Sequence, residues 1–366
     1  MYTLEKESMN NYNECQKKMV ESTGGSMNLT IKDLSKISGY SCATISRVLT
    51  NKPNVSPKTR QAVLDAITKN GYKPSVYNLM KSTEKNSSVL ITVDDVSNSF
   101  YVDIIHTIQV YLREHGFLSL VGITENLPSN ELEFLAFAKK NGFAGLVLVT
   151  PIETPQLRSL IENLECPVVL VNRYLRSMDL DAVCMDNYRG GYIATEYLIR
   201  HGHRRICHFA GPLESTASLE RIHGYEDAMR DNAIEFSQND ILNGNLKRKS
   251  GYNFGVAFVE KQMDYTAVFF ANDLMAIGFC EAITERGLKI PNDISVIGID
   301  ATPLAAQGPI KITTVGIAPQ TMGIDAAKIL LSRINGTNRD TPHKVIHPPL
   351  IHSNHSVKTL DTVPSK

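Results

Sequence analysis

From about residue 89 onward, the sequence alternates short apolar segments with amphipathic ones, and this alternation constrains the fold more than any other feature. Strands are predicted at residues 89–93, 117–123, 146–149, 168–171, 183–185, 206–210, 267–270 and 295–299. Helices are predicted near residues 100–115, 129–140, 155–164, 189–201, 219–230, 250–261 and 273–286. Nearly continuous apolar strands separated by helices are typical of buried parallel sheets. Because the strands form two series, we expect an α/β domain of two lobes with parallel sheets.

Ahead of this alternation, the sequence predicts three short helices. Thr30 and Asp33 form a capping box at the start of the first helix, and Gly39 supplies the left-handed residue that ends it. Ser41 can cap the second helix, and Ser56 followed by a proline begins the third. Two short helices around a glycine turn, braced by a third, are typical of a helix-turn-helix domain that binds DNA.

The charge distribution favours the same interpretation. Residues 27–85 carry ten basic and three acidic side chains, which gives a net charge of +7. The whole chain has a formal net charge of zero, so the remaining residues sum to −7. A basic module on an acidic body is the electrostatic pattern of a nucleic-acid-binding protein, whereas the alternative is an ordinary solvated surface.

The start of the second predicted helix carries residues suited to reading DNA. If this end enters the major groove, Cys42, Ala43 and Arg47 face the base edges. Ser41 and Thr44 can hold phosphates. Arg47 is the strongest base reader because its planar fork can donate to two acceptors of guanine, whereas the other two offer only apolar contact. The alternative is that Arg47 is an ordinary surface arginine.

Four segments carry a specific resemblance: residues 30–39 (TIKDLSKISG), 43–49 (ATISRVL), 55–60 (VSPKTR) and 71–74 (GYKP). They resemble the headpiece of the lactose-repressor/galactose-repressor family of bacterial transcription regulators, and the resemblance continues to about residue 356. It implies an all-α helix-turn-helix headpiece followed by a two-lobed effector domain of the periplasmic-binding-protein-like type I. It also implies a homodimer, or a tetramer built from dimers, that binds near-palindromic double-stranded operator DNA.

The hinge departs from the family pattern. A leucine of the family's hinge helix wedges into the minor groove, and Lys81 occupies the corresponding position here. Lysine can contact a phosphate but cannot act as an apolar wedge. Either Leu79 or Met80 takes that role in a shifted register, or the hinge does not kink DNA in the usual way. The residues predicted to contact DNA are Thr30, Ser41, Cys42, Ala43, Thr44, Ser46, Arg47, Asn51, Asn54, Val55, Lys58, Thr59, Tyr72, Leu79 and Lys81.

Polar and aromatic residues cluster just after the predicted strands of the larger domain. Parallel strands present their carboxyl ends at one edge of a sheet, so these residues can meet in a cleft between the lobes. Arginines, amides and carboxylates around an aromatic ring suit a polyhydroxylated ligand. The set is similar to that of sugar-binding members of the family, which implies a sugar or sugar derivative as effector. The predicted effector-binding residues are Asn98, Phe100, Tyr101, Asn172, Arg173, Arg221, Asn272 and Asp300.

Two positions depart from the ribose-type pattern of the family. Asn172 replaces an acid, and Ile317 replaces an amide. These changes argue against ribose itself and leave the ligand open. A nucleoside or purine is the alternative to a sugar effector. The sequence also leaves open whether the effector acts as an inducer or as a corepressor.

Structural roles are the alternatives for several of these residues. Arg221 and Asp300 could form an ion pair across the lobes. Asn272 and Asp273 could be the N-cap of a helix, and we expect this capping role for Asp273. The two aromatic residues of the set could belong to the core.

Other functional classes find little support in the sequence. There is no GxGxxG loop after a strand, no P-loop, no GxSxG elbow and no HExxH pair, so we expect no enzyme activity, no catalytic residue and no cofactor. Six widely spaced cysteines give no metal-binding spacing, so no metal site is predicted. The second alternative function is that of a transport receptor that binds a ligand without binding DNA. The basic headpiece and the lack of an apolar signal-peptide core count against this alternative.

We therefore expect a disordered arm (residues 1–26), a helix-turn-helix domain (27–73), a hinge (74–87), a two-lobed effector-binding and dimerisation domain (88–357) and a tail (358–366). No apolar run approaches the ~18 residues of a membrane span, so a cytoplasmic protein without a membrane partner is expected. The predicted function is sequence-specific regulation of transcription, as a repressor whose operator affinity a small molecule controls.

Overall fold

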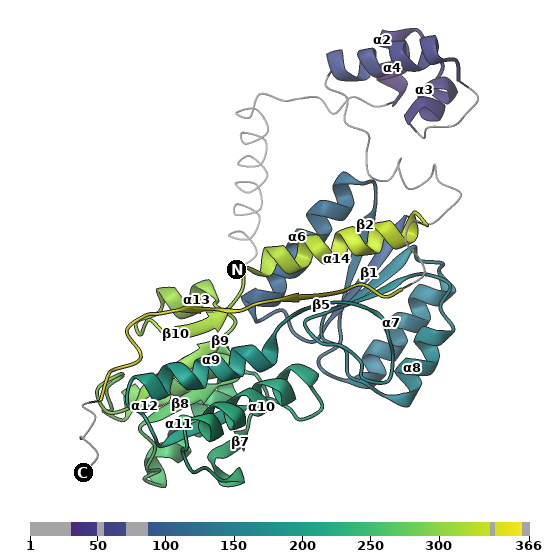
Figure 1. Cartoon of the computed structure of the whole chain (residues 1–366). Coiled ribbons are helices and arrows are strands. Elements are labelled where there is room, and N and C mark those ends of the chain that lie inside the picture. The colour runs from purple at the N-terminus through teal and green to yellow at the C-terminus, as the bar shows by residue number, and fades with distance from the viewer. Residues whose placement is uncertain (1–30, 50–54, 71–86, 337–340, 361–366) are drawn as a thin grey trace, which may run out of the picture. The chain divides into compact units, whose positions relative to one another are not determined.

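The computed structural model describes residues 31–49, 55–70, 87–336 and 341–360. The chain divides into two compact units, Met1–Lys85 and Asn86–Lys366. The first unit contains the helices α2 (Ile31–Ser38), α3 (Cys42–Leu49) and α4 (Pro57–Lys69), which are purple in Figure 1. Their buried side chains form a small core of Leu34, Ile45, Val48 and Val63.

The predicted helix boundaries of the first unit are confirmed where the structure describes them. Gly39 follows α2 with a φ of 75°. Ser41 Oγ accepts a hydrogen bond from the N–H of Thr44 (3.1 Å) and so caps α3. Ser56 caps α4 in the same way, with a proline at the start of the helix. These local signals give the predicted three-helix arrangement.

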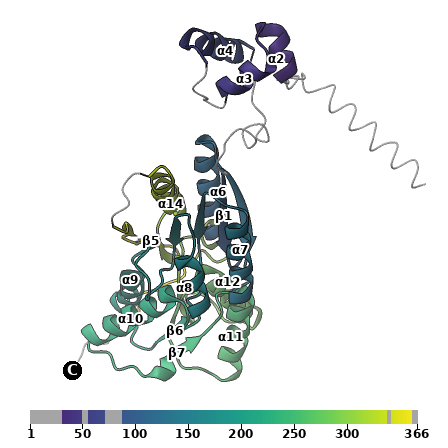
Figure 2. The ribbon, with the colours of Figure 1, turned by 90° about the vertical axis from the view of Figure 1, so that its right-hand side faces the viewer.

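The second unit contains two six-stranded sheets, one in each lobe. The first sheet has the order β11-β5-β4-β3-β1-β2, formed by β1 (Ser88–Val93), β2 (Leu118–Ile123), β3 (Gly145–Leu148), β4 (Val168–Val171), β5 (Asp181–Met185) and β11 (Lys344–His347). The second sheet has the order β12-β10-β9-β8-β6-β7, formed by β6 (Ile206–Ala210), β7 (Ile241–Asn243), β8 (Ala267–Phe270), β9 (Ser295–Ile299), β10 (Thr313–Gly316) and β12 (Leu350–His352). Adjacent strands run parallel, except that β12 is antiparallel to β10. In Figure 2 the lobe with β1 and α14 lies above the lobe with β6 and β7.

Helices cover both faces of each sheet, as the strand–helix alternation predicted. In the first lobe, one face packs against α6 (Ser99–Glu114) and α14 (Pro319–Ile334), and the other against α7 (Pro128–Lys140) and α8 (Pro155–Glu162). In the second lobe, the pairs are α9 (Asn187–Arg200) with α10 (Thr216–Asp231), and α11 (Arg248–Glu260) with α12 (Asp273–Glu285). The short helix α13 (Pro303–Gln307) follows β9. Among the described helices, none has the length and apolar character to span a membrane.

The sequence did not predict β7 or the elements that follow β9. These later elements matter because the chain passes between the lobes three times, from β5 to α9, from β10 to α14 and from β11 to β12. The last passage is the long yellow segment of Figure 1. The loops after β1 and β4 in the first lobe, and after β8 and β9 in the second, carry the residues that border the space between the lobes.

Candidate functional site

Helix α3 has one buried face and one exposed face. Ile45 and Val48 are buried in the core of the first unit. Cys42, Ala43 and Arg47 are exposed. The three side chains predicted to face base edges therefore share the solvent side of the helix, as insertion into a major groove requires.

Hydroxyl pairs lie at the starts of two of these helices. Ser41 Oγ lies 2.9 Å from Thr44 Oγ1 at the start of α3, and Ser56 Oγ lies 2.8 Å from Thr59 Oγ1 at the start of α4. Lys58, in the first turn of α4, is exposed. Helix N-termini favour anions because their backbone N–H groups lack intrahelical partners. These side chains therefore occupy positions where DNA phosphates can bind.

The remaining predicted DNA contacts are less accessible or are not described. Val55 is half-buried and packs against the core of the first unit, so packing accounts for it at least as well as DNA contact. Ser46 is also half-buried. Outside the described residues lie Thr30, Asn51, Asn54, Tyr72, Leu79, Met80 and Lys81.

A cavity of about 230 Å³ lies between the two lobes of the second unit. Four of the eight predicted effector-binding residues line it: Asn98, Tyr101, Arg173 and Asn272. The sequence analysis missed the rest of the lining, which consists of Asp94, Asp95, Glu125, Asn126, Pro212, Asn245, Leu246, Lys247 and Leu274. Both lobes contribute to this lining, so a ligand held here contacts both.

The other predicted residues lie beside the cavity rather than on its wall. The Phe100 ring packs edge-on against Tyr101, with ring centroids 5.7 Å apart. Asn172 Nδ2 donates to the Tyr101 hydroxyl (3.4 Å). Asn98 Nδ2 donates to Asp300 Oδ2 (2.9 Å). This last hydrogen bond joins the lobes, because Asn98 precedes α6 and Asp300 follows β9.

Arg221 lies in the second lobe, in α10, and is buried. Its Nε donates to Asn187 Oδ1 (2.9 Å), and its Nη1 donates to the carbonyl oxygen of Ala271. Asp300 belongs to the same lobe, so the alternative of an Arg221–Asp300 ion pair across the lobes is wrong. Arg221 instead ties α10 to the loop that follows β8.

The capping role expected for Asp273 is also wrong. Asn272 is the N-cap of α12, because its side chain accepts the N–H of Met275 (3.0 Å). Asp273 is fully buried and accepts hydrogen bonds from the N–H and hydroxyl of Thr302 (2.8 and 2.9 Å). Its other oxygen accepts from the Thr314 hydroxyl (2.6 Å). The carboxylate therefore fixes the loop after β9 that carries Asp300.

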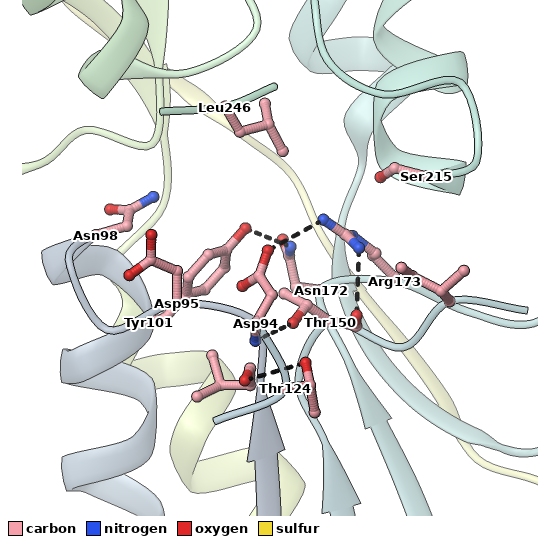
Figure 3. A network of polar contacts seen from close by, with 12 residues as sticks. Asp94, Asp95, Asn98, Tyr101, Thr124, Thr150, Asn172, Arg173, Ser215 and Leu246 are labelled. Carbon is pink, nitrogen blue, oxygen red and sulfur yellow. Dashed lines mark hydrogen bonds and ion pairs between the residues drawn. The ribbon is translucent and has the colours of Figure 1, made fainter. Parts of the chain in front are cut away.

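Asp94, which directly follows β1, is the most informative residue that the sequence analysis missed. Figure 3 shows its carboxylate pointing into the same space as the Arg173 guanidinium. Its N–H donates to Thr150 Oγ1 (2.8 Å), and Arg173 Nη1 donates to the Thr150 carbonyl (3.2 Å). Arg173 Nη2 lies 3.7 Å from Asp94 Oδ2. Asp94 Oδ1 and Arg173 Nε are buried and have no hydrogen-bond partner within the described part of the chain.

Unusual backbone conformations gather around the same cavity. Eight non-glycine residues of the described chain have a positive φ, and six of these lie in loops at the cavity: Glu125, Asn126, Asn172, Leu246, Asp300 and Ala301. Left-handed conformations are unfavourable for residues with a Cβ and tend to cluster at functional sites. Their concentration here supports the cavity as a binding site.

Burial also perturbs the acids around the cavity. It raises the pKa of Asp94, and the neighbouring Arg173 guanidinium opposes this rise. Burial raises the pKa values of Asp300 and Asp273, and the proximity of the two carboxyl groups adds to the rise for Asp273. Such perturbed groups are typical of ligand-binding and catalytic sites.

A wider cavity of about 470 Å³ lies in the second lobe, near the start of β6. Its wall includes the exposed ion pair between Arg205 and Asp264, and Tyr265 donates to Asp240 (2.9 Å). These polar groups already have partners. The cavity between the lobes is therefore the stronger candidate, because its buried polar atoms still lack partners.

We expect the Glu131→Gln variant to lose less stability than the wild type between about pH 5 and pH 8. Glu131 lies in the first turn of α7, accepts long hydrogen bonds from the Thr92 hydroxyl and the Ile152 N–H (both 3.3 Å), and is 4% exposed. Burial raises its pKa to about 7. A carboxyl whose pKa is raised by folding stabilises the native state at low pH, and this contribution disappears as the pH rises through about 7.

Urea unfolding of the wild type and of Glu131→Gln across this pH range measures the effect. The two free energies of unfolding should diverge by on the order of 2 kcal/mol as the carboxylate ionises. If the free energies of unfolding of the two proteins change with pH in parallel, ionisation of Glu131 does not destabilise the native state and the prediction is wrong.

Comparison with known proteins gives matches along most of the chain. Residues 30–75 match the family described as bacterial regulatory proteins, lacI family, and residues 195–356 match a periplasmic binding protein-like domain. The chain is 29% identical over 339 residues to the HTH-type transcriptional regulator DegA of Bacillus subtilis (strain 168), with 92% of this chain and 100% of DegA covered. It is 30% identical over 332 residues to the HTH-type transcriptional repressor PurR of Histophilus somni (strain 129Pt), with 90% and 99% covered.

Solved structures show the same architecture. The transcriptional regulator CelR in complex with cellobiose matches with a TM-score of 0.69 and 26% identity, over 89% of this chain and 99% of that one. The lac repressor dimer bound to operator and the anti-inducer ONPF matches with a TM-score of 0.74 and 21% identity, over 90% and 99%. The helix-turn-helix headpiece and the two-lobed body expected from the sequence are therefore confirmed.

Proposed function

This chain belongs to the lacI family of bacterial regulatory proteins, and we propose that it is a repressor controlled by a carbohydrate effector. The members of this family are DNA-binding transcription regulators and not enzymes. The repressor binds operator DNA through α3 and the effector through the cavity between the lobes. As a regulator of transcription, it acts in the cytoplasm, where bacterial DNA lies.

The exposed face of α3 is the observation that carries the DNA-binding part of this proposal. Arg47 lies on that face with Cys42 and Ala43, while the opposite face packs into the core. Hydroxyl groups at the starts of α3 and α4 stand where they can hold the phosphates on either side. Base readers framed by phosphate contacts are the arrangement that a helix-turn-helix needs in a major groove.

The lining of the cavity supports a carbohydrate as the effector. One aromatic ring, that of Tyr101, lies among side chains that supply both donors and acceptors, and sugar hydroxyl groups need both. A volume of about 230 Å³ is below the usual range of pockets for drug-sized ligands and favours a small effector. The similar regulator CelR binds the sugar cellobiose, which also supports this class of ligand.

The effector is proposed to act by changing the angle between the lobes. A ligand in the cavity contacts Asn98 and Tyr101 in the first lobe and Asn272 in the second, so it stabilises one relative position of the lobes. Because one three-helix headpiece reads a short half-site, the repressor is proposed to bind a near-palindrome as a homodimer, and the lobe angle sets the spacing of its two headpieces. Such coupling is typically ~1–3 kcal/mol and is reciprocal between DNA and effector.

Selection of DNA from a random duplex library by the full-length protein tests this proposal. We expect enrichment of a near-palindromic site, with an affinity that falls as the salt concentration rises. A neutral sugar from a screened panel should then weaken or strengthen binding to that site by about 5- to 150-fold. A library that stays unenriched at low and high salt, with and without the panel, would contradict the proposal.

A further inference from the structure

Two buried polar atoms on residues that line the cavity have no hydrogen-bond partner among the described residues. One is Asp94 Oδ1, which can only accept a hydrogen bond while the carboxyl is ionised. The other is Arg173 Nε, which can only donate one. Leaving such groups unpaired is costly, so a natural ligand is expected to satisfy both.

The other groups at this corner of the cavity, around Asp94 and Arg173, are already saturated or fixed. Arg173 Nη1 donates to the Thr150 carbonyl (3.2 Å), and Asp94 is held through its own N–H by the Thr150 hydroxyl (2.8 Å). The neighbouring Asp95 is satisfied, because its two oxygens accept the N–H and the hydroxyl of Ser97 (both 2.8 Å). Asp94 Oδ1 and Arg173 Nε are the buried atoms of this corner that no described group satisfies, and Figure 3 shows Asp94 between Tyr101 and Arg173.

We propose that Asp94 and Arg173 bind hydroxyl groups of the effector, Asp94 as an acceptor and Arg173 as a donor, and that Asp94 thereby makes the site selective for uncharged, polyhydroxylated ligands. A hydroxyl group has both a proton that it can donate to Asp94 and lone pairs that can accept from Arg173. A phosphate or carboxylate group has no proton to donate at neutral pH and is repelled by the carboxylate of Asp94. An ammonium group can donate to Asp94 but has no lone pair for Arg173.

The other charges around the cavity agree with the exclusion of anionic ligands. Asp95 and Glu125 also line it, whereas Lys247 is its remaining basic group beside Arg173. Three carboxylates therefore face two cations, and Arg173 already lies beside Asp94. An anionic ligand would add to an excess of negative charge. This inference rests on the proposed effector function of the cavity and narrows its ligand to sugars or polyols without phosphate or acid groups.

Binding of matched ligands to the full-length wild-type protein tests the inference. The probes are glucose, galactose, xylose and arabinose, each measured against its sugar phosphate, its uronic acid or its amino sugar where one exists. We expect at least one neutral sugar to raise the melting temperature, and each charged derivative of that sugar to bind at least about 10-fold more weakly. A charged derivative that binds as tightly as its parent, or a panel in which no neutral sugar binds, overturns the proposal.

Variants identify the residue responsible. Asp94→Ala should weaken binding of the neutral sugar by about 10- to 100-fold, the usual range for a hydrogen bond to a charged group. Asp94→Asn should reduce the difference in affinity between the sugar and its phosphate. Asp179→Asn is the matched control, because Asp179 is 67% exposed in the same lobe and does not line the cavity. A deoxy sugar that lacks the hydroxyl bound by Asp94 should bind the wild type more weakly than the parent sugar does. The Asp94→Ala variant should bind the deoxy sugar and the parent sugar almost equally. Equal losses in both proteins overturn the assignment.

Operator binding measured on the same preparations separates this inference from the proposed function. If a sugar phosphate binds more tightly than its parent while operator binding responds to it, only the role of Asp94 fails. If no small molecule changes operator binding, the effector function itself fails. The melting temperatures of unliganded Asp94→Asn and Asp94→Ala show that they are folded, and some loss of stability is expected because the Asp94 carboxylate lies 3.7 Å from the buried Arg173 guanidinium.

Discussion

Replacing Arg47 with alanine is expected to lower affinity for the selected operator by at least about 100-fold in a dimer, since each bidentate arginine–guanine contact supplies ≈ 1–3 kcal/mol of discrimination. Arg47 lies on the exposed face of α3, and Ile45 and Val48 anchor the opposite face in the core. Because the substitution removes no core side chain, the headpiece should stay folded. Affinity for random duplex DNA should fall only a few-fold, through the loss of one positive charge per headpiece.

Competition between the selected operator and a random duplex, at several salt concentrations, measures both effects. Arg47→Lys is the matched control for charge, because lysine keeps the positive charge but lacks the planar fork that pairs with guanine. It should retain nonspecific affinity and lose most of the discrimination. If both substitutions reduce the affinity for the operator and the affinity for random DNA by the same factor, Arg47 contacts a phosphate and does not read a base.

The headpiece could be predicted from the sequence because its signals are local. Gly39, Ser41 and Ser56 each act within a few residues of their own position, through a left-handed conformation or a helix cap. A pattern of neighbouring residues is enough to place such features. The strand–helix alternation of the body is a local signal of the same kind, and it gave the two lobes.

The missed elements depend on contacts that are distant in the sequence. β7 has only three residues, too few to show a period, and β11 alternates between exposed and half-buried positions. β11 pairs with β5, about 160 residues earlier, and the chain then returns to the other lobe. No local pattern specifies such a pairing.

The site was predicted in part, for the same reason. The rule that polar residues after strand ends form the site identified Asn98, Arg173 and Asn272. The same rule applies to Asp94, but its importance appears only from the unpartnered oxygen that the folded chain places beside Arg173. Asp273 looked like a helix cap because it begins a helix, and only the threonines of later segments reveal its structural role.

Replacing Gly191 with alanine is expected to destabilise the body by about 3 kcal/mol or more, while the same change at the adjacent Gly190 leaves stability unchanged or slightly higher. Helices α9 and α10 cross so closely that a Cβ on Gly191 would lie 2.9 Å from Arg221 Cα and closer still to the Arg221 carbonyl oxygen. Helix backbone cannot yield as a flexible side chain does, so α10 must move. A Cβ on Gly190 would meet no atom nearer than 3.4 Å, where it touches the end of the Met185 side chain.

The displacement of α10 should reach the effector site as well. Arg221 holds the Ala271 carbonyl and Asn187, and Ala271 precedes Asn272 on the cavity wall. We therefore expect Gly191→Ala to weaken any effector found in the panel, whereas Gly190→Ala binds it like the wild type. Urea unfolding and titration of both variants with the same sugar make the comparison. Equal stability and equal affinity in the two variants would mean that the close crossing of α9 and α10 does not position Arg221.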